Sequence, residues 1–297
     1  MSYSIKDTSP RYVMGRKYLM GSTGEKLSPQ EWRKIAEKRV LEFLRECKAA
    51  HAREIKVALE DGPFHWVTAN AIRKLYQEGK LRRRRRSYGD TKGKKASFYY
   101  PSELRYADVV DVIEEKLPII AAYTELNENP NQRQRLGHLA EDFIMPLFEK
   151  AGYIVVAKDT RFFRGRLWPR RTDLDFIVYG EQENRWYGVQ IKNSLDYPEW
   201  DDIAELIDIC NFLKIVPWLI ARICPKDYAW ELIQCGGFVT LFWERRWLLT
   251  KENKEIAEKI ARKTAIKVTT MDKLDEFAKN LTKDLGKIHK LEVRQKS

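Results

Sequence analysis

The sequence lacks the features that mark membrane, secreted and zinc-binding proteins. It has no run of eighteen apolar residues, so no membrane-spanning helix is expected. Its first twenty residues lack the apolar core of a secretory signal. Its four cysteines show neither CxxC spacing nor nearby histidine pairs, which argues against zinc. We therefore expect a cytoplasmic protein with reduced cysteines and no contact with a membrane.

Glycine motifs that bind nucleotides are absent as well. The 15 glycines form neither a P-loop nor a dinucleotide-binding fingerprint, so we expect no nucleotide cofactor. What the chain has in excess is positive charge, because 55 Lys and Arg against 43 Asp and Glu leave a net charge of +12. Such an excess favours a polyanionic partner, nucleic acid first. With 297 residues, 43% of them hydrophobic, the chain is long enough for two folded domains.

Three helices are expected in the first part of the chain. The first begins at Ser28, a capping residue that is followed by Pro29 and, three positions on, by Glu31. Helical spacing predicts the second helix over residues 52–60 and the third over residues 65–79.

The third helix has an apolar side and a polar side. At 100° per residue, the apolar side carries Val67, Thr68, Ala71, Ile72 and Leu75. The polar side carries Trp66, Asn70, Arg73 and Lys74. Residues 80–100 then predict two strands around a turn, with basic side chains on the first strand and near the tip: Arg82, Arg83, Arg84, Arg85, Arg86, Lys94 and Lys95.

Three helices followed by a basic hairpin resemble a winged-helix domain over residues 28–101. Such domains lay the third helix in the major groove of double-stranded DNA and the hairpin along phosphates. The resemblance implies that the polar side of the third helix and the basic hairpin bind DNA. The alternative is a protein-interaction domain whose charges are solvated, although five consecutive arginines repel one another unless a polyanion neutralises them.

Acidic side chains in the middle of the chain stand at positions where apolar ones are expected. Residues 135–156 predict an amphipathic helix followed by a strand, and Glu141 lies at the border of the helix's buried stripe. An acid that reaches from this border to the surface is the plain alternative. In the strand predicted over 172–180, Asp173 and Asp175 share one face.

The next strand, over residues 184–194, carries Gln190 and Lys192 on one face. The turn between the two strands is short, which predicts an antiparallel hairpin. Buried charges cost several kcal/mol unless they are paired or bind a metal. Asp175 and the Gln190 amide oxygen are hard ligands suited to Mg²⁺, and Asp173 is a second candidate for the same role. An Asp–Lys salt bridge at a sheet edge is the structural alternative.

This order of residues resembles the PD-(D/E)xK nucleases, a superfamily that includes restriction endonucleases and archaeal junction resolvases. The resemblance covers about residues 134–245 and assigns catalytic roles to Glu141, Asp175, Gln190 and Lys192. It implies that Asp175, Gln190 and Glu141 bind Mg²⁺, with Mn²⁺ as a possible substitute. It also implies an α/β fold with a restriction-endonuclease-like mixed sheet flanked by helices. Gln190 departs from the family pattern, which has an acid there.

The expected division is an N-terminal arm (1–27), a winged-helix DNA-binding domain (28–103), a connecting helix and linker (104–133) and a nuclease-like domain (134–297). The expected activity is that of a metal-dependent endonuclease acting on double-stranded DNA, a site-specific type II restriction endonuclease first. A structure-selective junction or repair nuclease and a non-catalytic DNA-binding protein are the alternatives.

Two further expectations concern the last part of the chain. Cutting both strands of a palindromic site requires two copies, so a homodimer is expected. A helix predicted over residues 199–223 could supply its interface through Trp200, Phe212 and Trp218, unless these belong to the core. Residues 229–250 predict a hairpin that turns at Gly236–Gly237.

Overall fold

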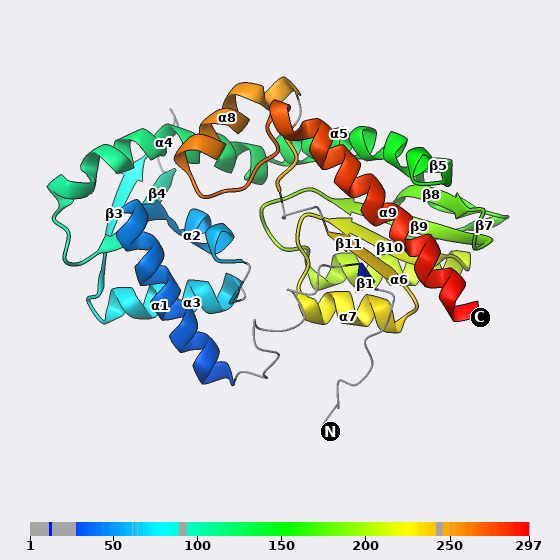
Figure 1. Cartoon of the computed structure of the whole chain (residues 1–297), viewed down its shortest axis with the longest axis horizontal. Helices are drawn as coiled ribbons and strands as arrows, with labels where there is room; N and C mark the ends of the chain where they lie inside the picture. The colour runs from blue at the N-terminus through cyan, green and yellow to red at the C-terminus, as the bar shows by residue number, and fades with distance from the viewer. Residues whose placement is uncertain are drawn as a thin grey trace. The chain divides into compact units, whose positions relative to one another are not determined.

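The computed structural model of the chain describes residues 12–13, 28–60, 62–63, 65–88, 94–241, 246–249 and 251–296 (Figure 1). Apart from Tyr12–Val13, the expected N-terminal arm lies outside these residues, as does the tip of the basic hairpin, 89–93. No helix within the described ranges is long and apolar enough to cross a membrane.

The chain forms two compact units. Within the described residues, unit 1 consists of 12–13, 134–248 and 272–296, and unit 2 consists of 28–133 and 249–271. Residues 249–271 therefore pack with the N-terminal part of the chain and not with the segment that precedes them.

Unit 1 is built on a six-stranded sheet of order β1-β11-β10-β9-β8-β5. Strands β5, β8 and β9 are antiparallel, whereas β9, β10, β11 and β1 are parallel, so the sheet is mixed. The strands are β1 (Tyr12–Val13), β5 (Tyr153–Thr160), β8 (Leu174–Gly180), β9 (Arg185–Lys192), β10 (Val216–Ala221) and β11 (Phe238–Leu241). A two-stranded hairpin, β6 (Phe162–Phe163) and β7 (Arg166–Leu167), lies between β5 and β8 in the chain.

Helices cover both faces of this sheet (Figure 1). Helices α5 (Pro130–Lys150) and α9 (Leu274–Lys296) pack on the face that carries Phe176, Val189 and Ile191. Helices α6 (Trp200–Leu213) and α7 (Lys226–Gln234) pack on the face that carries Ile177 and Leu219. The expected α/β fold with a mixed sheet between helices is therefore confirmed.

The prediction of one helix over residues 199–223 is wrong for the second half of this range. Helix α6 ends at Leu213, because Lys214 takes a left-handed conformation with φ 60°, and strand β10 follows. Trp218, on β10, is fully buried and hydrogen-bonds to Thr240, so it belongs to the core and not to an exposed interface.

The prediction of a β-hairpin that turns at Gly236–Gly237 is also wrong. Residues 226–234 form helix α7, and strand β11 runs parallel to β10. A parallel neighbour requires a crossover connection, which α7 supplies.

Unit 2 begins with three helices and a small antiparallel sheet. Helix α1 starts at the expected place, because the Ser28 hydroxyl accepts from the Glu31 backbone and the Glu31 carboxylate accepts from the Ser28 backbone. The sheet has the order β2-β4-β3. The elements are α1 (Pro29–Cys47), β2 (Ala50–His51), α2 (Ala52–Ala58), α3 (His65–Gln77), β3 (Leu81–Ser87) and β4 (Lys95–Pro101).

Helix α4 (Tyr106–Glu128) packs within unit 2, and α5 begins two residues after it ends. The segment expected over residues 104–133 to be a connecting helix and a linker is therefore mostly helical. Helix α8 (Lys254–Lys263) packs beside α4 (Figure 1), and the short 3-10 helices Lys251–Asn253 and Met271–Lys273 flank the segment that contains it.

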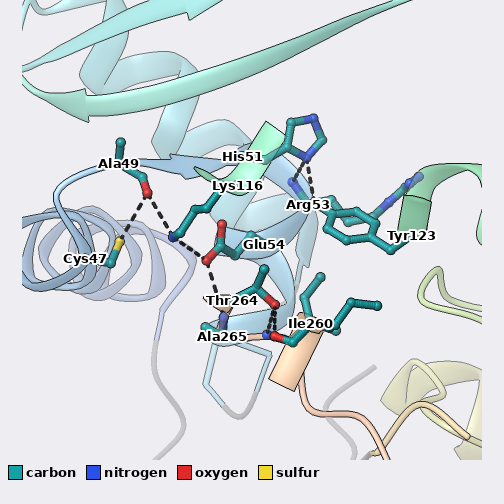
Figure 2. A network of polar contacts seen from close by, with 11 residues as sticks. Cys47, Ala49, His51, Arg53, Glu54, Lys116, Tyr123, Ile260, Thr264 and Ala265 are labelled. Atoms are coloured by element: carbon teal, nitrogen blue, oxygen red, sulfur yellow. Dashed lines mark hydrogen bonds and ion pairs between the residues drawn. The ribbon is translucent and has the colours of Figure 1, made fainter. Parts of the chain in front are cut away.

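A buried ion pair ties these parts of unit 2 together (Figure 2). The Lys116 ammonium on α4 donates to the Glu54 carboxylate on α2 at 2.7 Å and to the Ala49 carbonyl at 3.0 Å. The same Glu54 oxygen accepts from the Ala265 backbone at 3.3 Å. Side-chain exposure is 1% for Glu54 and 8% for Lys116. This contact joins α2, α4 and the chain after α8.

Candidate active site and DNA-contact surface

Asp175 and Gln190 meet where β8 begins and β9 approaches its end. Phe176 lies opposite Val189 in the antiparallel register, which makes Asp175 and Gln190 the next pair along the two strands. The Gln190 amide nitrogen donates to one Asp175 oxygen at 2.8 Å, and the Ile191 backbone N–H donates to the other. The two residues predicted from the sequence as neighbours are therefore in direct contact.

The Asp175 carboxyl is held in a poor environment for a negative charge. Burial raises its pKa to about 7, the Ile191 N–H opposes this rise, and the Glu141 charge adds to it. The Lys192 ammonium lowers the pKa without contacting the carboxylate closely enough to cancel the effect of burial. Asp175 receives hydrogen bonds from two neutral donors, so among the described residues its charge has no directly bonded cation.

Lys192 points to the face of the sheet that α6 covers. Since Val189 and Ile191 pack against α5 and α9, the alternating residues Gln190 and Lys192 face the opposite way. The Lys192 ammonium donates to the Asp202 carboxylate at 2.9 Å, and both side chains are about one-third exposed. The second Asp202 oxygen accepts from the Glu199 backbone at the start of α6, which fixes the carboxylate.

Glu141 lies on α5, with a side chain only 9% exposed. This agrees with its expected position at the border of the buried stripe. Its oxygens lie 3.5 Å from the Lys158 ammonium and 3.4 Å from His138 Nδ1. Lys158 also donates to Asp142 at 2.9 Å, a contact that raises the pKa of the lysine. Glu141 thus acts on Asp175 through its charge and not through a hydrogen bond.

Three neighbours of this site were missed by sequence reasoning. Lys158 lies on β5 beside Glu141, Asp202 lies on α6 beside Lys192, and Asn193 follows Lys192 directly. The Asn193 amide binds the Leu248 backbone through both its oxygen and its nitrogen, which anchors the end of β9. The polar Asn193 directly after Gln190-Ile191-Lys192 could have been recognised in the sequence as part of this site. The positions of Lys158 and Asp202 could not, because they are set by packing between elements far apart in the chain. Asp173, the second candidate ligand, is exposed.

The donors fit Mg²⁺ in type. Asp175 and Glu141 offer carboxylate oxygens, and the Gln190 carbonyl oxygen becomes available if its amide turns over. A cation would also relieve the unfavourable charge at Asp175. In number the set is sparse, because the described residues contain no group of three His, Cys, Asp or Glu side chains arranged to hold a metal.

Helix α3 exposes the side that was predicted to face DNA. Thr68, Ala71, Ile72 and Leu75 are buried. On the other side, Asn70, Arg73 and Lys74 are exposed and Trp66 is 42% exposed. Lys74 is paired with Glu37 at 2.7 Å, so its charge is partly matched within the unit.

The arginines of β3 divide between two faces of the small sheet. Opposed residues of an antiparallel pair share a face. Arg82, Arg84 and Arg86 therefore lie with the buried residues Tyr100, Phe98 and Ala96 of β4. On this face Arg86 pairs with Glu114 and Arg84 stacks over Tyr106, both on α4.

The other face of β3 lies on the side of α3. Arg83 and Arg85 stand opposite Tyr99 and Ser97, and the Arg83 guanidinium lies 4.9 Å from the centre of the Tyr76 ring on α3. Lys95 is exposed and shares this face, whereas Lys94 pairs with Glu125 at 3.3 Å. Among the described residues, Arg83, Arg85 and Lys95 of this face pair with no acid, whereas on the α4 face Arg86 pairs with Glu114 and Arg84 is covered by Tyr106.

Comparisons with known proteins give little to set beside this geometry. No family model matches the chain, and no curated protein matches it. Among solved structures, metal-depleted Ecl18kI in complex with uncleaved, modified DNA is similar at 13% sequence identity, over 87% of this chain and 86% of that chain, with a TM-score of 0.27. A likeness this low carries no argument about this chain, so the case for its function rests on its own residues.

Proposed function

We propose that the chain is a Mg²⁺-dependent DNA endonuclease of the PD-(D/E)xK type, acting as a site-specific restriction endonuclease. One observation carries the proposal. The carboxylate of Asp175 is partly buried and, among the described residues, receives hydrogen bonds from neutral donors only. It lies beside Gln190, and Lys192 stands two residues further along the strand of Gln190. Burial without a bonded cation is costly for a structural residue, and it suits a residue that binds one.

Each residue of the site has a role that follows from its surroundings. Asp175, Gln190 and Glu141 would hold Mg²⁺, which when bound would activate a water molecule and draw charge from the phosphodiester. The Lys192 ammonium, fixed by Asp202, has donors left to orient the attacking water or to stabilise the charge that develops on the phosphorus oxygens. Lys158 balances part of the charge of Glu141.

Unit 2 would supply DNA recognition as a winged-helix domain. Its element order, three helices and a hairpin joined to a short first strand, supports this assignment. The exposed side of α3 would enter the major groove, and the cations of β3 and β4 would follow phosphates. Cleavage of both strands would require a homodimer, for which Trp200 and Phe212, each 40% exposed on α6, remain available.

A non-catalytic DNA-binding protein is the second candidate. The observation that favours it is the neutral Gln190 where an acid would complete the metal site, together with the sparse donor set of the described residues. Such a protein would keep the fold and the DNA-contact surface and would bind DNA equally with Mg²⁺ or EDTA.

The test is to incubate methylated and unmethylated supercoiled plasmid with the parent protein in Mg²⁺ or in EDTA. We expect discrete linear fragments in Mg²⁺ alone from one of the two plasmids. Lys192→Ala should lose cleavage while it retains DNA binding, and Gln190→Glu should retain or raise activity because it restores an acidic ligand. Full cleavage by Lys192→Ala would contradict the proposed site, and binding without any cleavage by the parent would favour the second candidate.

A further inference from the structure

The hairpin β6–β7 has a tight turn at its tip. Its two turn residues, Arg164 and Gly165, both have positive φ, 46° and 78°, which is the conformation of a two-residue turn that matches strand twist. The Trp168 backbone donates to the Arg161 carbonyl at 2.8 Å and extends the pairing by one step. The hairpin is therefore a defined element between β5 and β8.

The hairpin and its flanks carry a dense positive charge. Residues 160–172 contain five arginines and no acid. In the ion pairs of the described residues, only Arg170 meets an acid, Asp208 at 3.5 Å, and both of these side chains are exposed. Arg161 and Arg166 donate instead to the backbone carbonyls of Arg170 and Phe212.

The two faces of the hairpin differ in their contacts. Phe163 and Trp168 are buried and pack against Trp186 and against Phe212 of α6, so one face is anchored to unit 1. The other face bears Phe162 and Leu167, which stand opposite each other in the pairing. They are 54% and 56% exposed, the highest values of any large apolar side chain in the described residues.

Aromatic rings hold two of the arginines in place. The Arg164 guanidinium lies 4.7 Å from the centre of the Trp186 ring and 5.3 Å from that of Phe163. The Arg170 guanidinium lies 5.3 Å from the centre of the Trp168 ring. A guanidinium stacked in this way keeps in-plane N–H donors for a phosphate and loses less conformational entropy when it binds one, although Arg170 already directs one donor to Asp208.

The β6–β7 hairpin follows β5 at the end of the sheet where the candidate active site lies. Thr160, at the end of β5, pairs with Leu174, the residue before Asp175. Arg171 is four residues from Asp175, a span of at most about 14 Å. Successive phosphates of one DNA strand advance about 3.4 Å along the axis, so a strand held at Asp175 brings its next few phosphates within reach of these arginines.

We infer that the β6–β7 hairpin is a second DNA-binding element, in unit 1, whose arginines bind phosphates while Phe162 and Leu167 enter a groove as an apolar wedge. Exposed apolar side chains on groove-binding proteins act in this way, next to cations that contact the backbone. A second copy of the chain is a poorer occupant of this face, because packing two hairpins together would bring unmatched arginines against one another. The hairpin's place beside a cleavage site rests on the proposed function, whereas its binding of DNA does not.

The test measures binding of a short duplex by fluorescence anisotropy in EDTA, from low to high salt, with the full chain. The variant Arg161→Gln/Arg164→Gln/Arg171→Gln should raise Kd at least about tenfold and reduce the log–log salt slope by about 2 to 3, since each phosphate that is no longer neutralised lowers it by about 0.9. The matched control, Lys273→Gln/Lys279→Gln/Lys283→Gln, removes the same charge from exposed positions of unit 1 and should change the slope by less than about 1. Phe162→Ser/Leu167→Ser should weaken duplex binding with little change in slope.

Binding by the triple arginine variant with the parent's Kd and slope would overturn the inference. So would equal losses in the arginine variant and the lysine control, because the effect would then be one of net charge. If Phe162→Ser/Leu167→Ser changed the molar mass in light scattering and left DNA binding intact, the apolar face would be a protein interface instead. Since the assay contains no Mg²⁺, a failure of cleavage would count against the proposed function and not against the hairpin.

Discussion

Two carboxylates whose pKa is raised by desolvation, the buried Glu54 in unit 2 and the partly buried Asp175 in unit 1, show what separates a structural acid from a candidate site. Glu54 is bonded to the Lys116 ammonium at 2.7 Å, and that ammonium is itself satisfied by a carbonyl. Asp175 also has a lysine nearby, Lys192, but that ammonium donates its hydrogen bond to Asp202. Asp175 instead accepts hydrogen bonds from two neutral groups, the Gln190 amide and the Ile191 backbone N–H.

The two acids differ in their charge partner as well as in burial, since Glu54 is buried and Asp175 is partly buried. Burial raises the pKa of both acids, and for Glu54 the Lys116 charge is the largest opposing influence. For Asp175 the largest opposing influence is a backbone N–H. Glu54 and its bonded ammonium join α2 to α4, whereas among the described residues no ammonium is bonded to Asp175, which is the basis of its proposed role as a cation ligand.

The largest effect is expected from Lys116→Met, which leaves Glu54 buried without its partner. The free energy of unfolding should fall by about 3–5 kcal/mol. Lys192→Met should cost less than about 1 kcal/mol, since its pair with Asp202 is about one-third exposed. Urea unfolding of both variants makes the comparison.

The double variant Glu54→Leu/Lys116→Met is the control for this loss. Replacing both charges by apolar groups removes the unpaired acid, so most of the stability should return. Equal costs for Lys116→Met and Lys192→Met would remove the distinction between the two acids.

Asp175→Asn is expected to stabilise the protein at high pH. The Asp175 pKa is about 7 in the folded protein and near 4 when unfolded, so the folded state loses stability as pH rises between these values. The neutral variant escapes this loss and should gain up to about 4 kcal/mol above pH 7, with no such gain at or below pH 4. Denaturation at pH 4 and pH 8 without metal measures the gain, and a variant less stable than the parent at pH 8 would refute it.

The smallest effect separates the two faces of β3. Arg83→Gln/Arg85→Gln, on the face beside α3, should reduce the salt slope of DNA binding by about 2. Arg84→Gln/Arg86→Gln, on the face bound to α4, should reduce it by less than about 1, because these arginines already contact Tyr106 and Glu114. The reverse order of slopes would show that DNA lies on the α4 side.

Local pattern was enough to predict several of these features. The capping signal at Ser28 marked the start of α1, helical spacing separated Thr68 from Asn70 on α3, and a short turn predicted the antiparallel contact of Asp175 with Gln190. Each of these depends on residues close in the chain.

Features set by distant packing could not be predicted in the same way. An apolar run after Leu213 suits a buried helix or a buried strand, and its place between β9 and β11 makes it a strand. The acid that holds Lys192 comes from α6, and which arginines of β3 are covered depends on α4. The spacing of residues in the sequence predicts neither the Lys192–Asp202 pair nor the covered arginines, because both depend on how separate elements pack.

Calorimetric titration of Mg²⁺ into the DNA-free protein at pH 8 and pH 6 tests the central claim most directly, that Asp175 is left for a cation. The account predicts that the parent binds Mg²⁺ at pH 8 and binds it more weakly at pH 6, because protons compete for a carboxyl whose pKa is about 7. Asp175→Asn should lose this binding, and Glu54→Gln should keep it if the variant remains folded. Binding of equal strength in the parent and in Asp175→Asn would contradict the account.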